Sequence, residues 1–553
     1  MKFGKAMIMW TIGRAQQQAL DSLIEQELGI SVAVLMEYAG VAVARTAKQL
    51  LHKTTSGFPI HILCGHGQNA GDALVAARLL TADGYAVFCY LDGSSTGTAE
   101  FFAQLKTVQA LGIPCLSLAD FAGMSAKPAL VIDGVFGTGF QTNRPLAPEI
   151  AASFRQAAAV RAAGGLVLAI DLPSGLSADT SEYVTDAIKA DATVTFLYPK
   201  TGLVSDPGRD LAGEISVDRL SVPAAILDSL LLKIEPNQRL PELIEPAEIR
   251  FWAPQRPRRL HKTQSGRMLL VAGGPGLGGA ALLAGEAALR SGAGLLNILT
   301  DESITTAILT RMPEAMVQGV NSNNDQEALA RLNAMFAKEP KAVGIGPGLL
   351  TNEQSAVLLE LVIRQAPKLV IDAGAITIIA ADQARFVPLL QARASASTGS
   401  RPAVLTPHPG EFRRLAPELT GLPRHEAAAR LADKLNCVIV LKGAATVIAA
   451  PQGRIMINNT GNTGLASGGS GDVLTGLLLG FLAQGMEEFP AAVSAVYLHG
   501  SAADLAVRDS SARVLIPSDL VRSLPAVFRL VGWESATSTL SDNAKLNGGP
   551  FHL

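Results

Sequence analysis

The stretch NTGNTGLASGGSGDVLTG, residues 459–476, is a glycine-rich loop that ends in Gly471-Asp472 and runs directly into an apolar helical pattern. Glycines allow backbone amides to turn toward phosphate oxygens, and a helix N-terminus adds free N–H groups and the positive end of its dipole. The pattern therefore predicts a nucleotide-phosphate site in an α/β domain. Bound phosphate repels a carboxylate, so we interpret Asp472 as a base that takes a proton from a hydroxyl attacking the nucleotide. The alternative is that Asp472 caps the helix, a position that Asp favours.

The composition is typical of a globular protein that has a large hydrophobic core and acts on small molecules. The chain has 553 residues, too many for one hydrophobic core, so we expect two or more domains. Hydrophobic residues make up 48% and charged residues 17% of the chain, and the net charge is -2. This charge balance does not indicate a basic surface that would attract nucleic acid or an acidic membrane. We expect neither as a partner. We expect a homo-oligomer.

The cysteines predict a reducing compartment. Cys64, Cys89, Cys115 and Cys437 lack CxxC spacing, and Cys64, Cys89 and Cys437 lie in or beside apolar runs. We expect buried thiols rather than disulfides or zinc ligands. The apolar residues near the N-terminus are interrupted and soon followed by polar ones, which predicts neither a signal peptide nor a membrane span. We therefore expect a cytoplasmic location.

Short β-rich runs alternate with helical stretches in two series, which is typical of parallel sheets covered by helices. The expected strands of the first series are 59–64, 86–91, 129–132, 166–170 and 192–196. Those of the second series are 268–272, 295–300, 342–345, 369–371, 403–405 and 438–441. Between the series, 234–259 carries five prolines, too many for a continuous helix or a central strand. We expect α/β domains over 1–235 and 240–535 and a disordered polar tail over 536–553.

The first expected strand is followed by the loop GHGQNAGDA, residues 65–73, and then by a helical run. Strand, glycine loop and helix form a phosphate cradle of the dinucleotide type. The loop also satisfies the loose pattern G-x-G-x-x-A, so an NAD-dependent dehydrogenase stays open here. Two further loops, DGVFGTG at 133–139 and DLPSG at 171–175, also follow strands. All three should converge on one crevice beyond the carboxyl ends of the strands.

Three side chains in these loops offer hard oxygen donors. Asn69, Asp133 and Ser174 together suit a monovalent or divalent cation, and their spacing does not choose between the two. The alternative for Asp133 and Asp171 is that each only accepts hydrogen bonds from local turn amides. Two such aspartates, each followed by a glycine-containing turn, favour a functional site.

These motifs resemble the NAD(P)H-hydrate epimerase family. Its signature GPGNNGGDGLVAAR corresponds to residues 65–78, and its second and third motifs correspond to VIDGVFGTGF at 131–140 and AIDLPSGLSADT at 169–180. The resemblance implies a Rossmann-like three-layer domain, with Asp133 catalytic and with K+ held by Asn69, Asp133 and Ser174. The implied hydrate-binding residues are Gln68, Asn69, Ala70, Gly71, Asp72, Gly137, Thr138, Gly139 and Asp171.

The first motif departs from the family pattern at four positions. His66 replaces the proline of the family pattern, Gln68 replaces the first asparagine, and Ala70 and Ala73 replace glycines. The methyl group of each alanine is expected to restrict the backbone at a position where the family has glycine. His66 matches no family role.

The second half also contains a pattern of the dinucleotide type. GRMLLVAGGPGLGG at 266–279 fits G-x-G-x-x-G after a strand, with Asp301 beyond the next strand. Because the loop at 461–471 already predicts a phosphate site, two such loops favour two phosphorylated molecules in one cleft. Further strand-end loops point to the same cleft: GIGPG at 344–348, DAGA at 372–375, TPHPGE at 406–411 and LKGAAT at 441–446.

Two side chains in these loops are candidate ligand contacts. Lys442 places a compact cation near phosphate, and the alternative is a solvated lysine at a strand end. His408 lies between two prolines and is therefore rigidly placed, whereas the alternative is an incidental core histidine.

This set resembles the ADP- or ATP-dependent NAD(P)H-hydrate dehydratase family, a member of the ribokinase-like fold, from about residue 261 to 520. The matching motifs are GGAALLAGEAALRSGAG at 278–294, GIGPGL at 344–349, LTPHPGEF at 405–412, VLKGAATVIA at 440–449 and the loop at 459–476. The opening HKTQSG departs from the usual HKGxxG at Thr263. The resemblance implies a ribokinase-like three-layer domain. The implied nucleotide contacts are Lys442, Gly443, Ala444, Ala445, Thr446 and Gly471. The implied hydrate contacts are Ala280, Gly348, His408 and Asp472.

Both halves fit one chemistry. Phosphorylation from ADP or ATP, with Mg2+ accompanying the nucleotide, turns the hydroxyl of a hydrated nicotinamide ring into a good leaving group. A chiral pocket accepts one epimer, so a second activity that interconverts the epimers explains the fusion. The alternatives are a ribokinase-like sugar or vitamin kinase with a fused binding domain, and a dehydrogenase. A non-enzymatic scaffold is disfavoured because nothing in the chain repeats.

Overall fold

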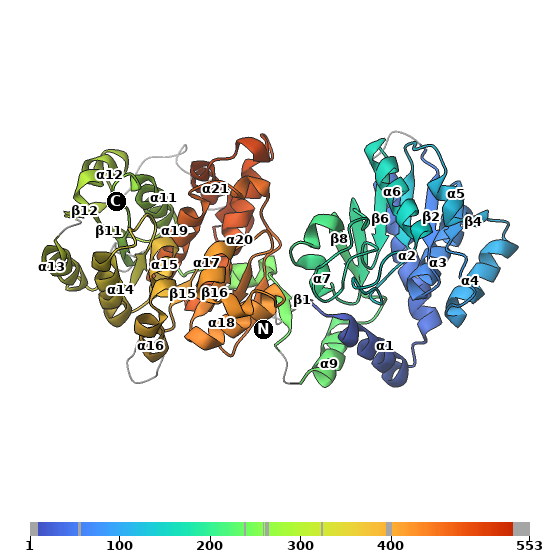
Figure 1. Cartoon of the computed structure of the whole chain (residues 1–553), viewed down its shortest axis with the longest axis horizontal. Helices are drawn as coiled ribbons and strands as arrows, with labels where there is room; N and C mark the ends of the chain where they lie inside the picture. The colour runs from blue at the N-terminus through green and yellow to red at the C-terminus, as the bar shows by residue number, and fades with distance from the viewer. Residues whose placement is uncertain are drawn as a thin grey trace, which may run out of the picture. The chain divides into compact units, whose positions relative to one another are not determined.

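The computed structural model describes residues 9–52, 57–236, 239–257, 259, 265–321, 324–393 and 401–534. The tail predicted over 536–553 and the departure at Thr263 lie outside these ranges. The chain divides into two compact units, an N-terminal unit over Met9–Pro241 and a C-terminal unit that begins at Glu242. Figure 1 colours the first from blue to green and the second from green to red.

The N-terminal unit is built on a seven-stranded parallel sheet of order β4-β3-β2-β5-β6-β7-β8. Its strands are β2 (Ile60–Cys64), β3 (Val87–Leu91), β4 (Cys115–Ser117), β5 (Leu130–Gly134), β6 (Leu166–Ile170), β7 (Ala192–Phe196) and β8 (Glu214–Asp218), with β1 (Met9–Trp10) ahead of them in the chain. Its helices are α1 (Arg14–Leu28), α2 (Val32–His52), α3 (Gln68–Ala82), α4 (Ala99–Ala110), α5 (Leu118–Ala122), α6 (Pro148–Ala162), α7 (Thr201–Val204), α8 (Arg209–Ala212) and α9 (Ala224–Ile234).

Helices cover both faces of this sheet. Ile62 packs into a core with residues of α1, α2, α3 and α9, whereas the next residue, Leu63, packs into a second core with Phe121 of α5 and Phe154 of α6. Successive side chains of a strand point to opposite faces, so one strand contributes to both cores. Strands buried on both faces are continuously apolar, which is why their sequences are so easily recognised.

The C-terminal unit is built on a larger sheet in which β12-β11-β10-β13-β14-β15-β16 are parallel and β16-β17-β18 are antiparallel. Its strands are β9 (Pro241–Leu243), β10 (Arg267–Val271), β11 (Leu295–Asp301), β12 (Met316–Val320), β13 (Ala342–Ile345), β14 (Leu369–Ile371), β15 (Val404–Leu405), β16 (Val438–Leu441), β17 (Val447–Ala449) and β18 (Ile455–Ile457). Its α-helices are α10 (Pro246–Phe251), α11 (Gly278–Arg290), α12 (Thr305–Arg311), α13 (Asp325–Phe336), α14 (Glu353–Gln365), α15 (Ala373–Ala381), α16 (Gln383–Arg393), α17 (Pro409–Leu415), α18 (Arg424–Leu435), α19 (Ser470–Ala483), α20 (Glu488–Ala506) and α21 (Pro517–Leu530). Its 3-10 helices are η1 (Glu302–Ile304), η2 (Pro417–Leu419), η3 (Thr463–Leu465) and η4 (Ala512–Val514).

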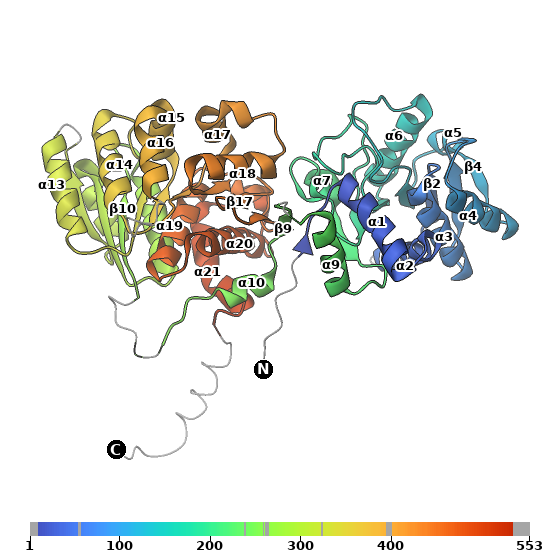
Figure 2. The same ribbon diagram turned by 90° about the horizontal axis from the view of Figure 1, so that it is seen from below.

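This sheet is also the middle of three layers. Met268 and Leu270 of β10 pack into one core with residues of α11, α19, α20 and α21. Figure 2 shows α14 to α18 on the opposite side of the sheet from α19 to α21. The prediction of two α/β domains with helix-covered parallel sheets is confirmed.

Both parallel sheets reverse their strand order at one point. In the N-terminal sheet the reversal lies between β2 and β5, and in the C-terminal sheet it lies between β10 and β13. Loops that leave the carboxyl ends of such strands diverge to opposite faces and open a crevice at the sheet edge. The predicted loops at 65–73 and 133–139 flank the first reversal, and those at 272–279 and 344–348 flank the second.

All the predicted strands exist, and the strands that the sequence did not predict are short or peripheral. In the N-terminal sheet these are the two edge strands, β4 and β8, whose residues are half-buried or exposed. In the C-terminal unit they are β9, β12 and the hairpin β17-β18. Edge strands lack the continuous apolar pattern of a strand that is covered on both faces, so periodicity does not find them.

Within the described ranges, no single helix is both long and apolar enough to cross a membrane. Two pairs reach such a length only in combination, α1 with α2 and α15 with α16, and their members meet at sharp bends of 118° and 115°.

The proline-rich segment is not a bare linker, because from Glu242 onward it packs into the C-terminal unit. Arg454 donates a hydrogen bond from Nε to Glu242 Oε1 at 3.0 Å and pairs with Glu248 at 2.7 Å. The Trp533 indole donates to the carbonyl of Ile249 at 2.7 Å. Two of its prolines lie at positions that tolerate proline, Pro241 at the first residue of β9 and Pro246 in the first turn of α10.

We expect Glu242→Gln to lower the Tm of the C-terminal unit by about 3–6 °C. The carboxylate of Glu242 is buried and forms charge-assisted hydrogen bonds, which contribute roughly 1–2 kcal/mol once discounted for the 37% exposure of Arg454. Differential scanning calorimetry of the full chain measures the shift. The matched control is Glu353→Gln, whose ion pair with Arg385 is exposed and should leave Tm unchanged. Equal shifts in both variants would contradict this assignment.

Candidate functional site

A cavity of about 710 Å³ opens at the carboxyl edge of the N-terminal sheet. Its wall includes the first turn of α3, the loop after β5 and part of α1. The predicted hydrate-binding residues that line it are Gln68, Asn69, Asp72, Gly137, Thr138, Gly139 and Asp171. Ala70 and Gly71 are buried within α3 and do not line the cavity.

The three predicted cation ligands lie together beside this cavity. Ser174 donates from its hydroxyl to Asp133 Oδ1 at 2.6 Å and from its backbone N–H to Oδ2 at 2.7 Å. The Asn69 amide donates to the carbonyl of Phe136 at 3.1 Å, and the Phe136 N–H donates to the Ser174 hydroxyl at 2.8 Å. Asp133 is fully buried, and burial raises its pKa to about 6 despite hydrogen bonds from Ser174 and Val135. Asp133 does not itself line the cavity, and its catalytic role stays a prediction.

The floor of the cavity holds a buried lysine that the sequence reasoning missed. Lys200 is 0% exposed, and its ammonium pairs with the Asp171 carboxylate and donates to the Phe196 carbonyl at 3.0 Å. The Thr195 hydroxyl also donates to Asp171, at 2.9 Å. Asp171 therefore bonds to a lysine and to strand β7 instead of only capping its own turn.

Two more carboxylates share this electrostatic environment. Asp21 of α1 accepts a hydrogen bond from the Gln17 amide at 2.8 Å, and burial raises its pKa to about 6 while Lys200 opposes the rise. Burial, Asp171 and Asp21 raise the pKa of Asp72 well above its ordinary value. Burial therefore raises the pKa values of both Asp21 and Asp72, and Lys200 opposes both rises.

In the C-terminal unit, Gly469 is the N-cap of α19 and has a φ of +98°. Asp472 is the third residue of that helix, so the capping alternative is wrong. Among the described residues, none donates a hydrogen bond to its carboxylate. Burial and the nearby Asp372 raise the pKa of Asp472 to about 6, while Lys442 opposes the rise.

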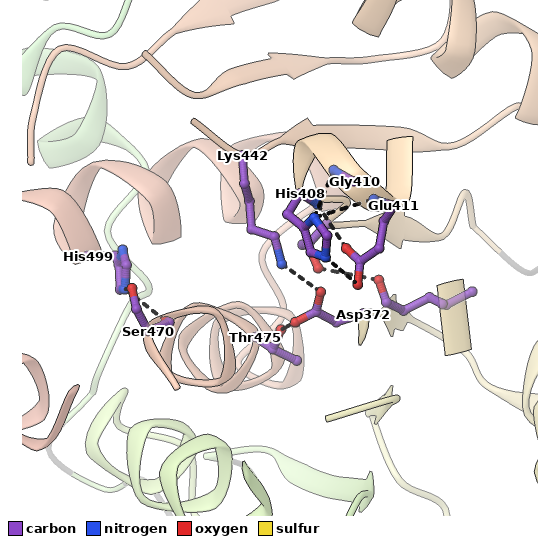
Figure 3. Close-up of polar contacts among 10 residues, drawn as sticks. Asp372, His408, Gly410, Glu411, Lys442, Ser470, Thr475 and His499 are labelled. Atoms are coloured by element: carbon purple, nitrogen blue, oxygen red, sulfur yellow. Dashed lines mark hydrogen bonds and ion pairs between the residues drawn. The ribbon is translucent and has the colours of Figure 1, made fainter. Parts of the chain in front are cut away.

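Lys442 lies at the end of β16 and points toward α19, as Figure 3 shows. Its ammonium binds Asp372 Oδ1 at 2.9 Å, and the Thr475 hydroxyl of α19 donates to Asp372 Oδ2 at 2.7 Å. The lysine side chain is 20% exposed and Asp372 is buried, so the solvated-lysine alternative is wrong. A side chain at Gly471 would start 3.3 Å from the ammonium, so glycine leaves room for it there.

His408 is the N-cap of α17 rather than an incidental core residue. Its Nδ1 accepts hydrogen bonds from the N–H groups of Gly410 at 2.9 Å and Glu411 at 3.3 Å. The His408 backbone N–H in turn donates to the Glu411 carboxylate at 2.8 Å, which completes a capping box. Because Nδ1 is an acceptor, the neutral ring carries its proton on Nε2, which faces Glu411 at 3.4 Å.

The other predicted contacts lie on tight turns around the second strand-order reversal. Gly348 has a φ of +63°, and a side chain there would lie 3.1 Å from Ala280, so these two predicted hydrate contacts are neighbours. The backbone N–H of Gly273 donates to the carbonyl of Pro347 at 2.8 Å and joins the loops after β10 and β13.

The predicted nucleotide loop after β16 is closed by one hydroxyl. Thr446 donates to the Gly443 carbonyl at 2.8 Å and accepts from the Gly443 N–H at 3.3 Å. Gly443 and Ala444 are exposed, whereas Ala445 and Thr446 are buried. The exposed half of the turn is free to meet a ligand, and the buried half anchors it.

Two family models match the chain, one in each unit. Residues 32–202 match the model described as YjeF-related protein N-terminus. Residues 268–526 match the model described as NAD(P)H-hydrate dehydratase.

Curated relatives match nearly the full length. The bifunctional NAD(P)H-hydrate repair enzyme of Moorella thermoacetica is 36% identical over 543 residues, which covers 94% of this chain and 97% of that protein. The chain belongs to the family of bifunctional NAD(P)H-hydrate repair enzymes. The Escherichia coli member is 30% identical and covers 93% of this chain and 92% of that protein. A solved structure of the ADP/ATP-dependent NAD(P)H-hydrate dehydratase from Bacillus subtilis, co-crystallised with ATP and Mg2+, is 36% identical, covers 52% of this chain and 98% of that chain, and has a TM-score of 0.45.

Membership of the repair-enzyme family decides between the alternatives drawn from the glycine patterns. The full-length relatives are repair enzymes, which supports neither a sugar or vitamin kinase nor an NAD-dependent dehydrogenase. The G-x-G-x-x-A and G-x-G-x-x-G patterns at residues 65–70 and 274–279 are therefore strand-to-helix turns of this family.

One expectation about the first motif of this repair enzyme is wrong. Helix α3 begins at Gln68, so Ala70 and Ala73 lie in a regular helix instead of a glycine loop. Alanine is the best helix former, and neither residue has a positive φ, so the added methyl groups impose no strain. Both side chains are fully buried, and Ala73 packs closely against Gly134.

From the sequence, no role was assigned to four charged residues in the two sites of this repair enzyme: Asp21, Lys200, Asp372 and Glu411, although the loops of Asp372 and Glu411 were placed at the C-terminal cleft. Lys200 and Asp372 follow strands β7 and β14, and that position was a signal that could have identified them. Asp21 lies on α1, ahead of the N-terminal family match, and gave no such signal.

Proposed function

We propose that this chain repairs hydrated NADH and NADPH through two activities. The N-terminal cavity interconverts the R and S epimers, and the C-terminal site dehydrates the S epimer with ADP or ATP, releasing phosphate and AMP or ADP. The observation that carries the proposal is the Asp472 carboxylate at the start of α19, which accepts no hydrogen bond from the described residues and lies beside the half-buried Lys442. That arrangement combines a proton acceptor, a cation and free helix N–H groups in one place.

The dehydration follows from these groups. The ring hydroxyl lies on the carbon beside the ring nitrogen, and Asp472 takes its proton as the oxygen attacks the terminal phosphorus. The bond from that phosphorus to the leaving AMP or ADP oxygen breaks. Phosphate then leaves with the C–O electron pair, assisted by the ring nitrogen, and loss of a proton from the adjacent carbon restores the ring double bond. Lys442, Gly471 and the turn Gly443–Thr446 are proposed to hold the nucleotide, while Ala280, Gly348 and the Nε2–H of His408 orient the hydrate.

Mg2+ is proposed to arrive with the nucleotide. The described residues contain no group of three His, Cys, Asp or Glu side chains arranged to hold a metal ion, and both Asp372 oxygens are already bonded. These residues fit an ion that keeps its waters and is held mainly by phosphate oxygens. Bound there, it would neutralise charge on the transferring phosphoryl group.

K+ is proposed to bind at Asn69, Asp133 and Ser174. The donor set consists of oxygens, and the fully buried Asp133 has no cationic side chain among its hydrogen-bond partners. A bound cation would offset the cost of burying this carboxylate and fix the turns after β5 and β6. Asp72 and Asp171 are then the carboxyl groups that face the substrate from the cavity wall.

We also propose a cytoplasmic location and a homo-oligomer. Free thiols support the location, because Cys64, Cys89 and Cys437 are buried and Cys115 is half-buried, none of them in a disulfide.

One assay tests the proposed function. Wild-type protein given mixed epimers and either nucleotide should return all the reduced-nicotinamide absorbance and release one phosphate per turnover. Asp472→Asn should lower this rate by ~100- to 10,000-fold, because the amide keeps the shape of the side chain and cannot accept the proton. Nucleotide affinity, measured by calorimetry, should be retained. A phosphorylated product that accumulates would indicate a kinase instead.

The dehydration rate should fall as the pH falls through about 6. Only the ionised Asp472 accepts a proton, and burial and Asp372 raise its pKa from 3.8 to about 6. Activity is therefore present above that pH and lost below it. The measurement is kcat for pure S epimer from pH 5 to 8. A rate that is constant down to pH 5 would exclude Asp472 as the base.

The epimerase activity should require K+, and Asp133→Ala should abolish the requirement together with the activity. Asp133 is the one formal anion among the proposed ligands, so its loss should be the most damaging of the three. With Asp133→Ala, the S epimer is consumed and the R epimer then converts at the spontaneous rate. A second readout is the Tm of the N-terminal unit, which should rise in KCl relative to choline chloride for wild type only. A K+-independent Tm in the wild type would contradict the site.

A further inference from the structure

Asp372 occupies a capping position and does not cap. It is the N-cap of α15, yet its side chain accepts no hydrogen bond from the first turn of that helix. Asp at this position ordinarily bonds to the N–H groups of the next residues. Here the carboxylate turns away from its own helix, and Figure 3 shows it between Lys442 and Thr475.

The buried carboxylate of Asp372 is saturated by partners from other elements. Lys442 from β16 binds one oxygen, and Thr475 from α19 binds the other. Burial alone raises the pKa of Asp372, but the Lys442 charge and the hydrogen bonds from Lys442, Thr475 and Thr406 outweigh burial and bring it below its ordinary value. The Lys442 charge and these hydrogen bonds therefore favour the anionic form of Asp372.

The same contacts place Asp372 and Lys442 beside the proposed base. Thr475 follows Asp472 by three residues on α19, so both lie on one face of the helix. The Lys442 ammonium lies next to Gly471, the residue before Asp472. Lys442 is thus close to two aspartates, and it is hydrogen-bonded to Asp372.

The remaining charged groups around this position are already engaged. Glu411 of α17 is buried, interacts electrostatically with Lys442 and closes the cap with His408. His499 of α20 bonds through Nε2 to the Ser470 carbonyl at 3.0 Å, and burial lowers its pKa to about 4, so it is neutral. Lys442 is consequently the cation whose charge lowers the pKa of Asp472, against burial and Asp372, which raise it.

We propose that Asp372 is a positioning residue that captures the Lys442 ammonium and prevents it from pairing with Asp472, which leaves the Asp472 carboxylate free to accept the proton of the hydrate. This inference rests on the proposed function of Asp472. A lysine released from Asp372 has Asp472 as its nearest alternative anion. A direct ion pair makes a carboxylate a much weaker base, because the charged form is stabilised. Because of Asp372, Lys442 can bind the nucleotide without forming an ion pair that would weaken Asp472 as a base.

The test is the pH dependence of kcat/KM for the S epimer in four variants of the full chain. Asp372→Asn should move the acid limb to lower pH by about 1 or more, because the repulsion from Asp372 is lost and the freed lysine also pairs with Asp472. The shift should be larger than the shift that the same substitution causes in the Lys442→Met background, where only the repulsion is lost. Lys442→Met should move the limb to higher pH, since its charge opposes the rise in the pKa of Asp472. The double variant Asp372→Asn/Lys442→Met should return the limb toward the wild-type position. Asp382→Asn, at the exposed far end of α15, removes one charge from the same helix and should change nothing.

A merely structural role for Asp372 predicts a different result. Loss of packing lowers the plateau of the profile without moving its limb, and removal of Lys442 then adds further loss instead of restoration. The proposal is overturned if the acid limb of the kcat/KM profile does not move in Asp372→Asn. It is also overturned if the acid limb of the double variant lies at the same pH as that of Asp372→Asn. If Asp372→Asn does not fold, a limb that fails to rise in Lys442→Met overturns it equally. Undiminished turnover by Asp472→Asn is a separate outcome, since it would refute the proposed function itself.

Discussion

One lysine shared among several carboxylates is the interaction on which both sites depend, and it is fully buried in the N-terminal unit and half-buried in the C-terminal unit. In the N-terminal unit Lys200 pairs with Asp171 while Asp21 and Asp72 lie nearby, and in the C-terminal unit Lys442 pairs with Asp372. Each pair joins residues that follow two strands of the same sheet. Burying a lysine costs so much that it must be paired, and the pairing determines which carboxylates stay ionised.

The carboxylates that are not bonded to the lysine have raised pKa values. Asp21 and Asp472 both have pKa values of about 6, because burial raises them and the lysine only partly compensates. A group whose pKa lies near the working pH is efficient at transferring protons. The same physical arrangement therefore recurs in two unrelated sheets, once around an open cavity and once at the start of a helix.

The parallel sheets make this arrangement possible. Their strands are covered on both faces, so polar side chains are excluded until each strand ends, and the carboxyl ends of all strands meet at one edge. The reversal of strand order then separates the loops and opens a crevice. Glycines with positive φ, such as Gly348 and Gly469, let the backbone approach closely there.

Much of the fold was determined by the sequence alone. The central strands are continuous apolar runs, so their positions and the two helix-covered sheets followed from periodicity, whereas the edge strands β4, β8 and β12 did not. The glycine loop before Asp472 likewise predicted the start of an apolar helix from local pattern, and phosphate binding there stays a prediction. These features are local in the chain, and local features can be recognised in a sequence.

Only the tertiary structure decided how the charges are shared. The sequence offered Asp372 as a strand-end turn, and it gave no indication that the carboxylate leaves its own helix for Lys442 and Thr475, 70 and 103 residues away. It also could not bring Asp21 of α1 to the same cavity as Lys200. A pKa depends on burial and on neighbours that are distant in sequence, so the proton chemistry of this chain exists only once its sheets have formed.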